Sequence, residues 1–286
     1  MRLDMHCHVK EGSIDSKVTL ESYINKLQEH GFQGMVITDH DTYEGYRHWK
    51  RNLKDKYKDF VVLKGIEYDT CDAGHILCIM PEGVKMRLLE LKGLPLSVLI
   101  NFVHSHGGIL GPAHPCGEKY LSFTNTKKYK KSPDITAKFD FIETFNACEP
   151  KESNQAAEEL ARKYNKPGVG GSDAHKIDCV SMAYTQLPEK VSTEMELISL
   201  LKKVSPQKVS ASGFLYTKTT KERIGKVNKV LVYSFWFYNK FGELARRNKR
   251  RLRGAIENPV DPIDPIDVKF LNNIKKYKIK RYKAEA

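Results

Sequence analysis

The stretch "MRLDMHCHVK" (residues 1–10) combines the pattern of a short strand with side chains that commonly bind metals. Side chains alternate between the two faces of a strand, so His6 and His8 face one way and Cys7 faces the other. Two neutral imidazoles on one face can hold a divalent ion such as zinc or iron. The alternative is a pair of unrelated surface histidines, and a motif this short does not decide between them.

Strand-like runs alternate with helical patterns through the first 215 residues. The predicted strands are residues 3–8, 32–38, 59–66, 75–80, 107–113, 139–145 and 166–172, and the predicted helices are 19–31, 96–108, 152–165 and 193–204. Three of these helices stop at Gly or Asn, as helices commonly do. The alternation predicts an α/β fold with a parallel sheet, and its regular repeat favours a barrel over an open sheet.

Metal-type side chains stand at the ends of these predicted strands. They are His6, His8, Asp39, His40, Asp41, Glu67, His114, Glu143, Asp173 and His175, with His75 opening a strand. In a barrel of parallel strands the carboxyl ends share one face, and that face carries the active site. The residues are therefore expected to converge in space, which favours the metal interpretation of His6 and His8.

A second His-x-His, in "VHSHGG", tests the spacing argument. His104 and His106 fall at the end of a predicted helix, where residues two apart do not face each other. We expect this pair to cap the helix or lie on the surface. His30 and His48, in polar helical segments, are expected to be solvated.

Length and composition fit either one large domain or a domain with an appendage. The chain has 286 residues, 40% of them hydrophobic, and contains no transmembrane-like stretch or signal-peptide pattern. Its six cysteines are scattered, without a Cys-x-x-Cys pair. We therefore expect reduced thiols and a cytoplasmic protein.

The positive charge is concentrated in the last quarter of the chain. Residues 1–215 hold 29 Lys and Arg against 28 Asp and Glu, whereas residues 216–286 hold 19 against seven. This division predicts a domain over 1–215 and a basic, partly helical extension over 216–286. The clusters at 246–253 and 275–283 would bind an anionic partner, either nucleic acid or a membrane surface, or would simply be solvated.

Seven separated motifs resemble, in order, those of the PHP (polymerase and histidinol phosphatase) family. They are "DMHCH", "ITDHDT", "GIEYD", "GHILCI", "GPAHP", "IETFN" and "GSDAH", spread over residues 1–215. The resemblance implies a distorted barrel of seven strands and helices that holds two or three divalent metals. Members of the family hydrolyse phosphate esters or serve as nuclease modules attached to polymerases.

The resemblance also implies a set of metal ligands. His6, His8, Glu67 and Asp173 would hold one ion, Asp15, His40 and His175 a second, and Glu67 with His75 and His114 a third. Asp15 has alternatives: Glu11 lies in the same loop, and Asp is also common at helix starts and turns. His75 could instead be a strand-end histidine bonded to backbone.

His40, Asp173 and His175 are the residues that we expect to be essential for catalysis. A ligating imidazole usually donates its other N–H to a carboxylate or a carbonyl. Asp39 and Asp41 are candidates for this role beside His40. The alternative for Glu143 and Asn146, the other candidates, is that they simply end a strand.

The expected reaction is hydrolysis of a phosphate monoester by a hydroxide that bridges Mn, Zn or Fe ions. The substrate would be a small phosphorylated metabolite or a nucleotide. The alternatives are a nuclease acting on DNA or RNA ends and a metal-binding module that only docks to a partner. The lysines after His114 (Lys127, Lys128, Lys130 and Lys131) would contact further phosphates or would be solvated.

Overall fold

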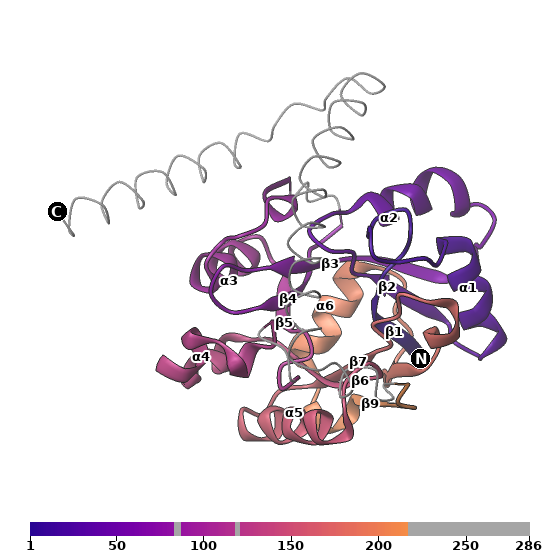
Figure 1. Ribbon diagram of the computed structural model, residues 1–286. Coiled ribbons are helices and arrows are strands. Elements are labelled where there is room, and N and C mark those ends of the chain that lie inside the picture. The colour runs from indigo at the N-terminus through magenta and orange to yellow at the C-terminus, as the bar shows by residue number, and fades with distance from the viewer. Residues whose placement is uncertain (83–86, 118–120, 217–286) are drawn as a thin grey trace, which may run out of the picture. The chain divides into compact units, whose positions relative to one another are not determined.

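The computed structural model describes residues 1–82, 87–117 and 121–216 (Figure 1). The predicted basic extension therefore lies outside the described residues, apart from Tyr216. The strands are β1 (Arg2–Cys7), β2 (Gly34–Ile37), β3 (Val61–Asp69), β4 (His75–Ile79), β5 (Ile109–Pro112), β6 (Ile142–Asn146), β7 (Gly168–Gly171), β8 (Ala183–Gln186) and β9 (Ser210–Gly213). The helices are α1 (Leu20–Glu29), α2 (Glu44–His48), α3 (Leu96–Ser105), α4 (Lys127–Lys131), α5 (Lys151–Lys163) and α6 (Glu194–Lys203). Shorter helical turns span Trp49–Leu53, Arg87–Glu90, Phe123–Asn125, Pro133–Lys138, Ile177–Cys179 and Pro206–Lys208.

A curled seven-stranded sheet, in the order β5-β4-β3-β2-β1-β8-β9, forms most of the fold, with β6 and β7 as a separate parallel pair. Hydrogen bonds join the β6–β7 pair to the larger sheet on both sides. Asp140 N, just before β6, donates to Leu110 O of β5, and Asp173 N, just after β7, donates to His6 O of β1. Strands β1 to β7 thus follow one another around a curved wall. This α/β arrangement is consistent with the predicted distorted barrel.

The prediction of a wholly parallel sheet is wrong. β1, β2 and β3 are parallel, but β4 is antiparallel to both β3 and β5, and β8 is antiparallel to β1 and β9. The physical reason is the connection after β3, which spans only residues 70–74 and is too short for the crossover that parallel strands require. Gly74, at φ +73°, supplies the left-handed backbone of this turn.

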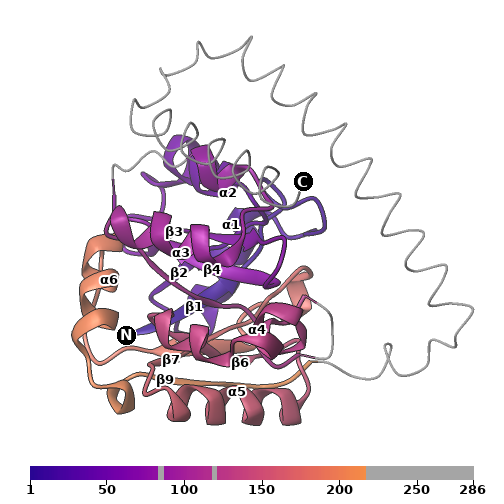
Figure 2. The same ribbon diagram turned by 90° about the vertical axis from the view of Figure 1, so that its left-hand side faces the viewer.

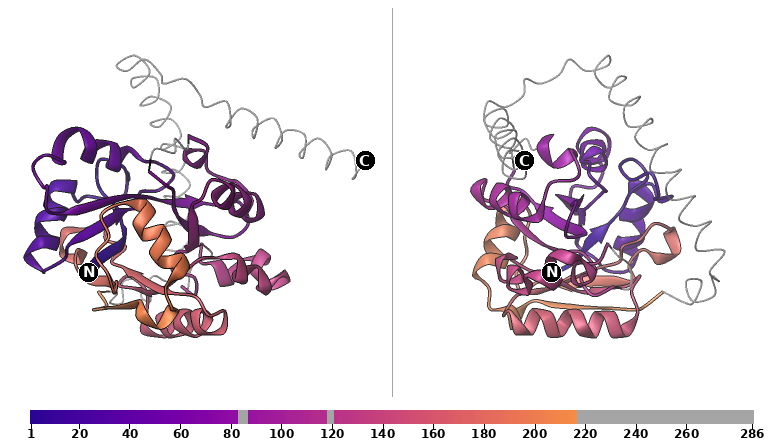
Figure 3. Two further views of the ribbon diagram at one scale, coloured as in Figure 1. Left: turned by 180° about the vertical axis from the view of Figure 1, so that it is seen from behind. Right: turned by 60° about the vertical axis from the view of Figure 1, so that its left-hand side comes forward.

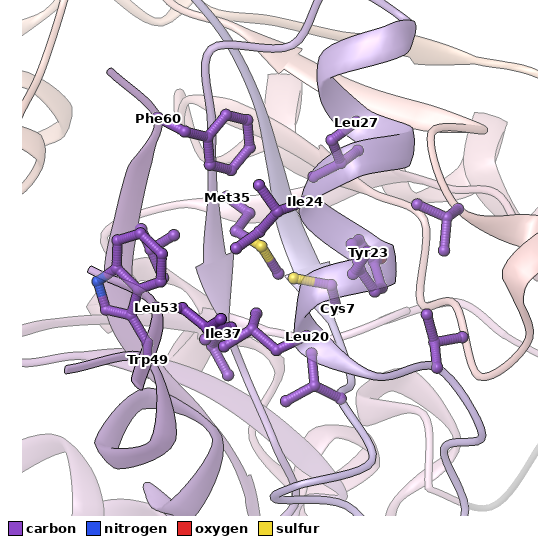
Figure 4. Close-up of a cluster of buried hydrophobic side chains, with 14 of the residues drawn as sticks. Cys7, Leu20, Tyr23, Ile24, Leu27, Met35, Ile37, Trp49, Leu53 and Phe60 are labelled. Carbon is purple, nitrogen blue, oxygen red and sulfur yellow. The ribbon is translucent and has the colours of Figure 1, made fainter. Parts of the chain in front are cut away.

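The four predicted helices are present as α1, α3, α5 and α6, close to their expected bounds. Thr19 caps α1 by accepting a hydrogen bond from Ser22 N. The apolar face of α1 packs on β1 and β2 (Figure 4). It consists of Leu20, Tyr23, Ile24 and Leu27. Cys7 contributes to this outer cluster, so it faces away from His6 and His8 as the alternation predicts.

Helix α6 packs on the apolar cluster that includes the first part of β1, whereas His6 and His8 stand at the end of that strand. Leu197, Ile198 and Leu201 pack in the same cluster as Leu3 and Met5 of β1. Figure 3 shows α6 in orange on the side that faces away from the viewer in Figure 1, and Figure 2 shows α5 beside β6.

Two expectations from composition can be compared with the described part of the chain. The six cysteines all lie in this part of the chain, and none of them is paired in a disulfide there. Among the described residues, no helix combines the length and the apolar character needed to cross a membrane.

Candidate metal centre

Glu67, near the end of β3, lies at the middle of the predicted site. It is 1% exposed, and imidazoles approach both of its carboxylate oxygens. His75 Nδ1 lies 2.9 Å and His114 Nε2 3.1 Å from Oε1. His40 Nδ1 lies 2.9 Å from Oε2. The antiparallel β4 explains why His75 belongs here, because the start of β4 lies beside the end of β3.

His6 and His8, from the end of β1, lie beside the same carboxylate. Their Nε2 atoms are 3.1 Å apart, and they lie 3.5 and 3.4 Å from Glu67 Oε2. Asp173 reaches this pair from the segment after β7, with Oδ1 3.7 Å from His6 Nε2 and 3.3 Å from His8 Nε2.

Asp15 completes an outer group with His40 and His175. Its Oδ2 lies 3.4 Å from His40 Nε2 and 3.3 Å from His175 Nε2. Glu11, the alternative in the same loop, is turned elsewhere and accepts a hydrogen bond from Leu20 N of α1. Thr19 is the N-cap of α1, so Asp15 does not start that helix.

The arrangement fits divalent metal ions. Ligands held 2.0–2.1 Å from a tetrahedral ion are about 3.3 Å apart, close to the separations between these imidazole and carboxylate atoms. Sets of three donor atoms lie within 4.8 Å of one another in three combinations: His8, His40 and His175; His6, His8 and Glu67; and His40, Glu67 and His75. Among the described residues, Glu67 Oε2 has no hydrogen-bond partner although it is buried and three imidazoles approach it, which is expected of an oxygen that binds an ion.

Glu143 orients His6 for binding through Nε2. Its Oε1 accepts a hydrogen bond from His6 Nδ1 at 2.9 Å, which leaves the Nε2 lone pair directed at the cluster. Its Oε2 accepts from His114 N and from Asn146 Nδ2. Glu143 and Asn146 therefore support the site rather than merely ending β6.

Ser13 orients His8 in the same way, and sequence reasoning missed it. His8 Nδ1 lies 3.2 Å from Ser13 Oγ, and that hydroxyl donates to Asp39 Oδ1 at 2.9 Å. Asp39 thus acts on His8 through Ser13. Asp41 accepts from Asp69 N. The sequence offered no signal for Ser13, because a serine in a loop is common.

Burial and mutual charge perturb the ionisation of the cluster. Burial opposes protonation of His40, but the carboxylates of Glu67 and Asp15 outweigh it and raise the pKa of His40 well above its ordinary value. Burial also favours the neutral form of Glu67, but the surrounding imidazoles hold its pKa well below the usual range. His8 differs: burial, together with His40 and His175, lowers its pKa to about 3. Without ions, the site is thus held together by charged pairs around a neutral His8.

The backbone is strained at the ends of three strands that build the site. Asp41, His114 and Asp173 have φ angles of 49°, 32° and 50°, a region that residues other than glycine rarely adopt. Such conformations cost about 1–3 kcal/mol each and cluster at functional sites.

The control histidines lie away from the cluster, as the helical spacing predicts. His104 Nε2 pairs with Asp140 Oδ2 on the surface. His106 is the C-cap of α3, and its ring bonds to Phe102 O. His30 is the C-cap of α1 and is exposed.

Comparison with known proteins gives matches in family and in fold. A protein assigned as a metal-dependent phosphoesterase from Bifidobacterium adolescentis superposes with a TM-score of 0.50 at 15% identity, over 70% of this chain and 95% of that one. The lesion-specific endonuclease PfuEndoQ from Pyrococcus furiosus superposes with a TM-score of 0.50 at 18% identity, over 71% and 56%. An amidohydrolase from Chromobacterium violaceum gives 0.51 at 12% identity, over 70% and 96%.

At these identities the superpositions show a shared fold. Among proteins of curated function, none matches the chain in sequence. The model of the PHP domain matches residues 4–170, and the model of the PHP-associated region matches residues 151–205. More than half of the chain is thereby accounted for, and the chain belongs to the PHP family.

Proposed function

We propose that the protein is a metal-dependent phosphoesterase that hydrolyses phosphate monoesters of small metabolites or nucleotides. The observation that carries this proposal is Glu67 Oε2, a buried oxygen without a hydrogen bond that has three imidazole nitrogens within 3.5 Å. A non-catalytic docking module would not require such a costly assembly of buried titratable groups.

Nine residues would hold two or three ions, of Mn, Zn or Fe, in the grouping that the family resemblance implies. They are His6, His8, Asp15, His40, Glu67, His75, His114, Asp173 and His175. Ions bound there would supply a hydroxide nucleophile near neutral pH and neutralise charge on the phosphate.

The protein's own contribution is orientation and access. Glu143 and Ser13 hold His6 and His8 in the tautomer that leaves Nε2 free. The side chains of Asp15, His40 and His175 are 56%, 26% and 30% exposed, so the outer group meets solvent. We place the incoming phosphate at this outer group, because the inner residues are buried.

A nuclease acting on DNA or RNA ends is the second candidate, favoured by α4. This helix follows His114 in the chain, and Lys127, Lys130 and Lys131 on it are exposed. Lys128 pairs with Asp72 in the turn that leads to His75, which ties α4 to the same rim as the ligands. A longer polyanion could reach these lysines. The shared fold of the endonuclease PfuEndoQ also supports this candidate.

The test begins with the purified full-length protein, reconstituted with Mn²⁺, Zn²⁺ or Fe²⁺ and analysed for bound metal. We expect two or three equivalents, and less than one equivalent would reject the multinuclear centre. Phosphate release from a phosphomonoester is then compared with cleavage of a short oligonucleotide. Preference for the oligonucleotide would replace the first candidate by the second.

Variants connect the activity to the cluster. His40→Ala and Asp173→Asn should nearly abolish phosphate release while the protein stays folded. His104→Ala is the matched control, because His104 pairs with Asp140 on the surface. Equal damage from His104→Ala and His40→Ala would show that activity does not depend on the cluster.

A further inference from the structure

Tyr216, the last described residue, reaches the metal centre from beyond the segments that match the family models. Those matches end at residue 205. After β9, the chain crosses to the site: Phe214 N donates to Met182 O, and Tyr216 N donates to Ala147 O in the loop after β6. The phenol hydroxyl of Tyr216 then donates to the backbone carbonyl of Asp173 at 3.0 Å.

This carbonyl also fixes a proposed ligand. His175 Nδ1 lies 3.0 Å from Asp173 O, so the ring donates its Nδ1–H to the carbonyl. The other ring nitrogen, Nε2, faces Asp15 and is left free to bind an ion. The carbonyl therefore accepts two hydrogen bonds, one from His175 and one from Tyr216. Its direction determines how the imidazole is turned.

The segment that carries this carbonyl is strained. Asp173 adopts φ +50°, where a non-glycine residue is held only by its surroundings. On its amino side, Asp173 N donates to His6 O at 2.8 Å. On its carbonyl side, Tyr216 supplies a donor from a distant part of the chain.

We propose that Tyr216 is a positioning residue that fixes the Asp173 carbonyl, and through it the His175 imidazole, for the outer metal ion. This inference rests on the proposed metal centre. It also extends the functional unit past the predicted boundary at residue 215. The hydrogen bond to Asp173 comes from the phenol hydroxyl, so removing that hydroxyl tests the role directly.

The experiment compares Tyr216→Phe with Tyr57→Phe in the full-length protein. Each variant removes one hydroxyl and keeps the ring. Tyr57 is the matched control because its hydroxyl, on a largely buried side chain, donates to Asn25 Oδ1 of α1, away from the metal centre. Metal-free protein is titrated with Co²⁺, whose visible absorption reports each binding step, and with Zn²⁺ against a chelator. Thermal unfolding of the metal-free protein is recorded in parallel.

For Tyr216→Phe we expect one binding step to weaken about tenfold, the lower end of what partners of metal ligands contribute, with the remaining steps unchanged. Tyr57→Phe should bind as the wild type does. Unchanged binding by Tyr216→Phe would overturn the positioning role. So would an equal weakening of every step accompanied by a lower melting temperature, since that describes a general structural role. A wild-type protein that binds no metal would instead reject the proposed function.

Discussion

Replacing Glu143 by Gln tests whether the tautomer of His6 is set by this one carboxylate. The substitution keeps size and shape but turns one acceptor oxygen into a donor. The carboxylate receives His6 Nδ1 at Oε1, and His114 N and Asn146 Nδ2 at Oε2. The Asn146 amide is itself held, because its Oδ1 accepts from Cys148 N. Two fixed donors therefore face the position of Oε2.

These donors decide how the new amide lies. Its oxygen must face His114 N and Asn146 Nδ2, since the opposite orientation loses two hydrogen bonds worth about 1 kcal/mol each. The amide NH₂ then faces His6 Nδ1, which has to become an acceptor. The proton of His6 moves to Nε2, the atom that the metal centre needs. Restoring the binding tautomer costs about 2 kcal/mol, equivalent to about 30-fold in affinity.

We expect Glu143→Gln to weaken Zn²⁺ binding about 30-fold in competition with a chelator near neutral pH. Glu44→Gln is the control, since Glu44 pairs with Arg47 on α2. The folded state is checked by circular dichroism. If folded Glu143→Gln bound Zn²⁺ within threefold of the wild type, Glu143 would not set the tautomer of His6.

Three further predictions concern the hydrogen bonds behind the metal centre, the protonation of His40 and the basic residues after 245. Ser13→Ala removes the hydroxyl that hydrogen-bonds to both His8 and Asp39, and it should weaken metal binding, measured by calorimetry, about tenfold. A folded variant with wild-type affinity would contradict this prediction. The pKa of His40 is higher in the folded protein than in the unfolded chain, so its protonation stabilises the metal-free fold fully below about pH 6.5, and this contribution is lost as the pH rises through the folded-state pKa. The melting temperature of the metal-free protein should therefore fall as the pH is raised through this range. Metal binding should also release protons, which is measured as a calorimetric heat that depends on the buffer. Removal of the residues after 245 should preserve phosphomonoester hydrolysis but reduce salt-sensitive binding to RNA, DNA or anionic vesicles. Undiminished binding by the truncated protein at low salt would show that these residues do not bind anions.

The sequence predicted the site best where side-chain type and strand position act together. His6 lies in β1, His8 follows its last residue, and Glu67 lies two residues before the end of β3. Their convergence followed from the fold class, because parallel strands bring their ends to one edge. The structure also brings His75 beside Glu67, but for a reason that the prediction of a parallel sheet did not contain. It opens an antiparallel strand, whose start lies beside the end of β3.

The sequence could not predict contacts that depend on one hydrogen bond between distant segments. Ser13 and Tyr216 have ordinary side chains in loops, and each acts by the direction of a single hydroxyl. Asp39 was expected beside His40, its neighbour in sequence, but its acceptor oxygen instead faces Ser13. Strands β8 and β9 were missed because "AYTQ" and "SASG" lack a continuous apolar run.

The proposed ligands differ in their exposure to solvent, and we expect buried and exposed ligands to contribute differently to stability and to turnover. His6 and His8 are fully buried beside Glu67, and they are braced by Glu143 and Ser13. We propose that an ion bound there would take the place of charged pairs in the metal-free fold and would stabilise the barrel. The proposed outer ligands meet solvent, and one of them, His175, follows a strained turn at Asp173. An ion held by them would exchange more readily and would have the space to accept a phosphate oxygen. Glu67 joins the two environments through Oε2, which lies within reach of both His6 and His40. The buried ion is therefore expected to set the stability of the site, while the exposed ion sets its turnover.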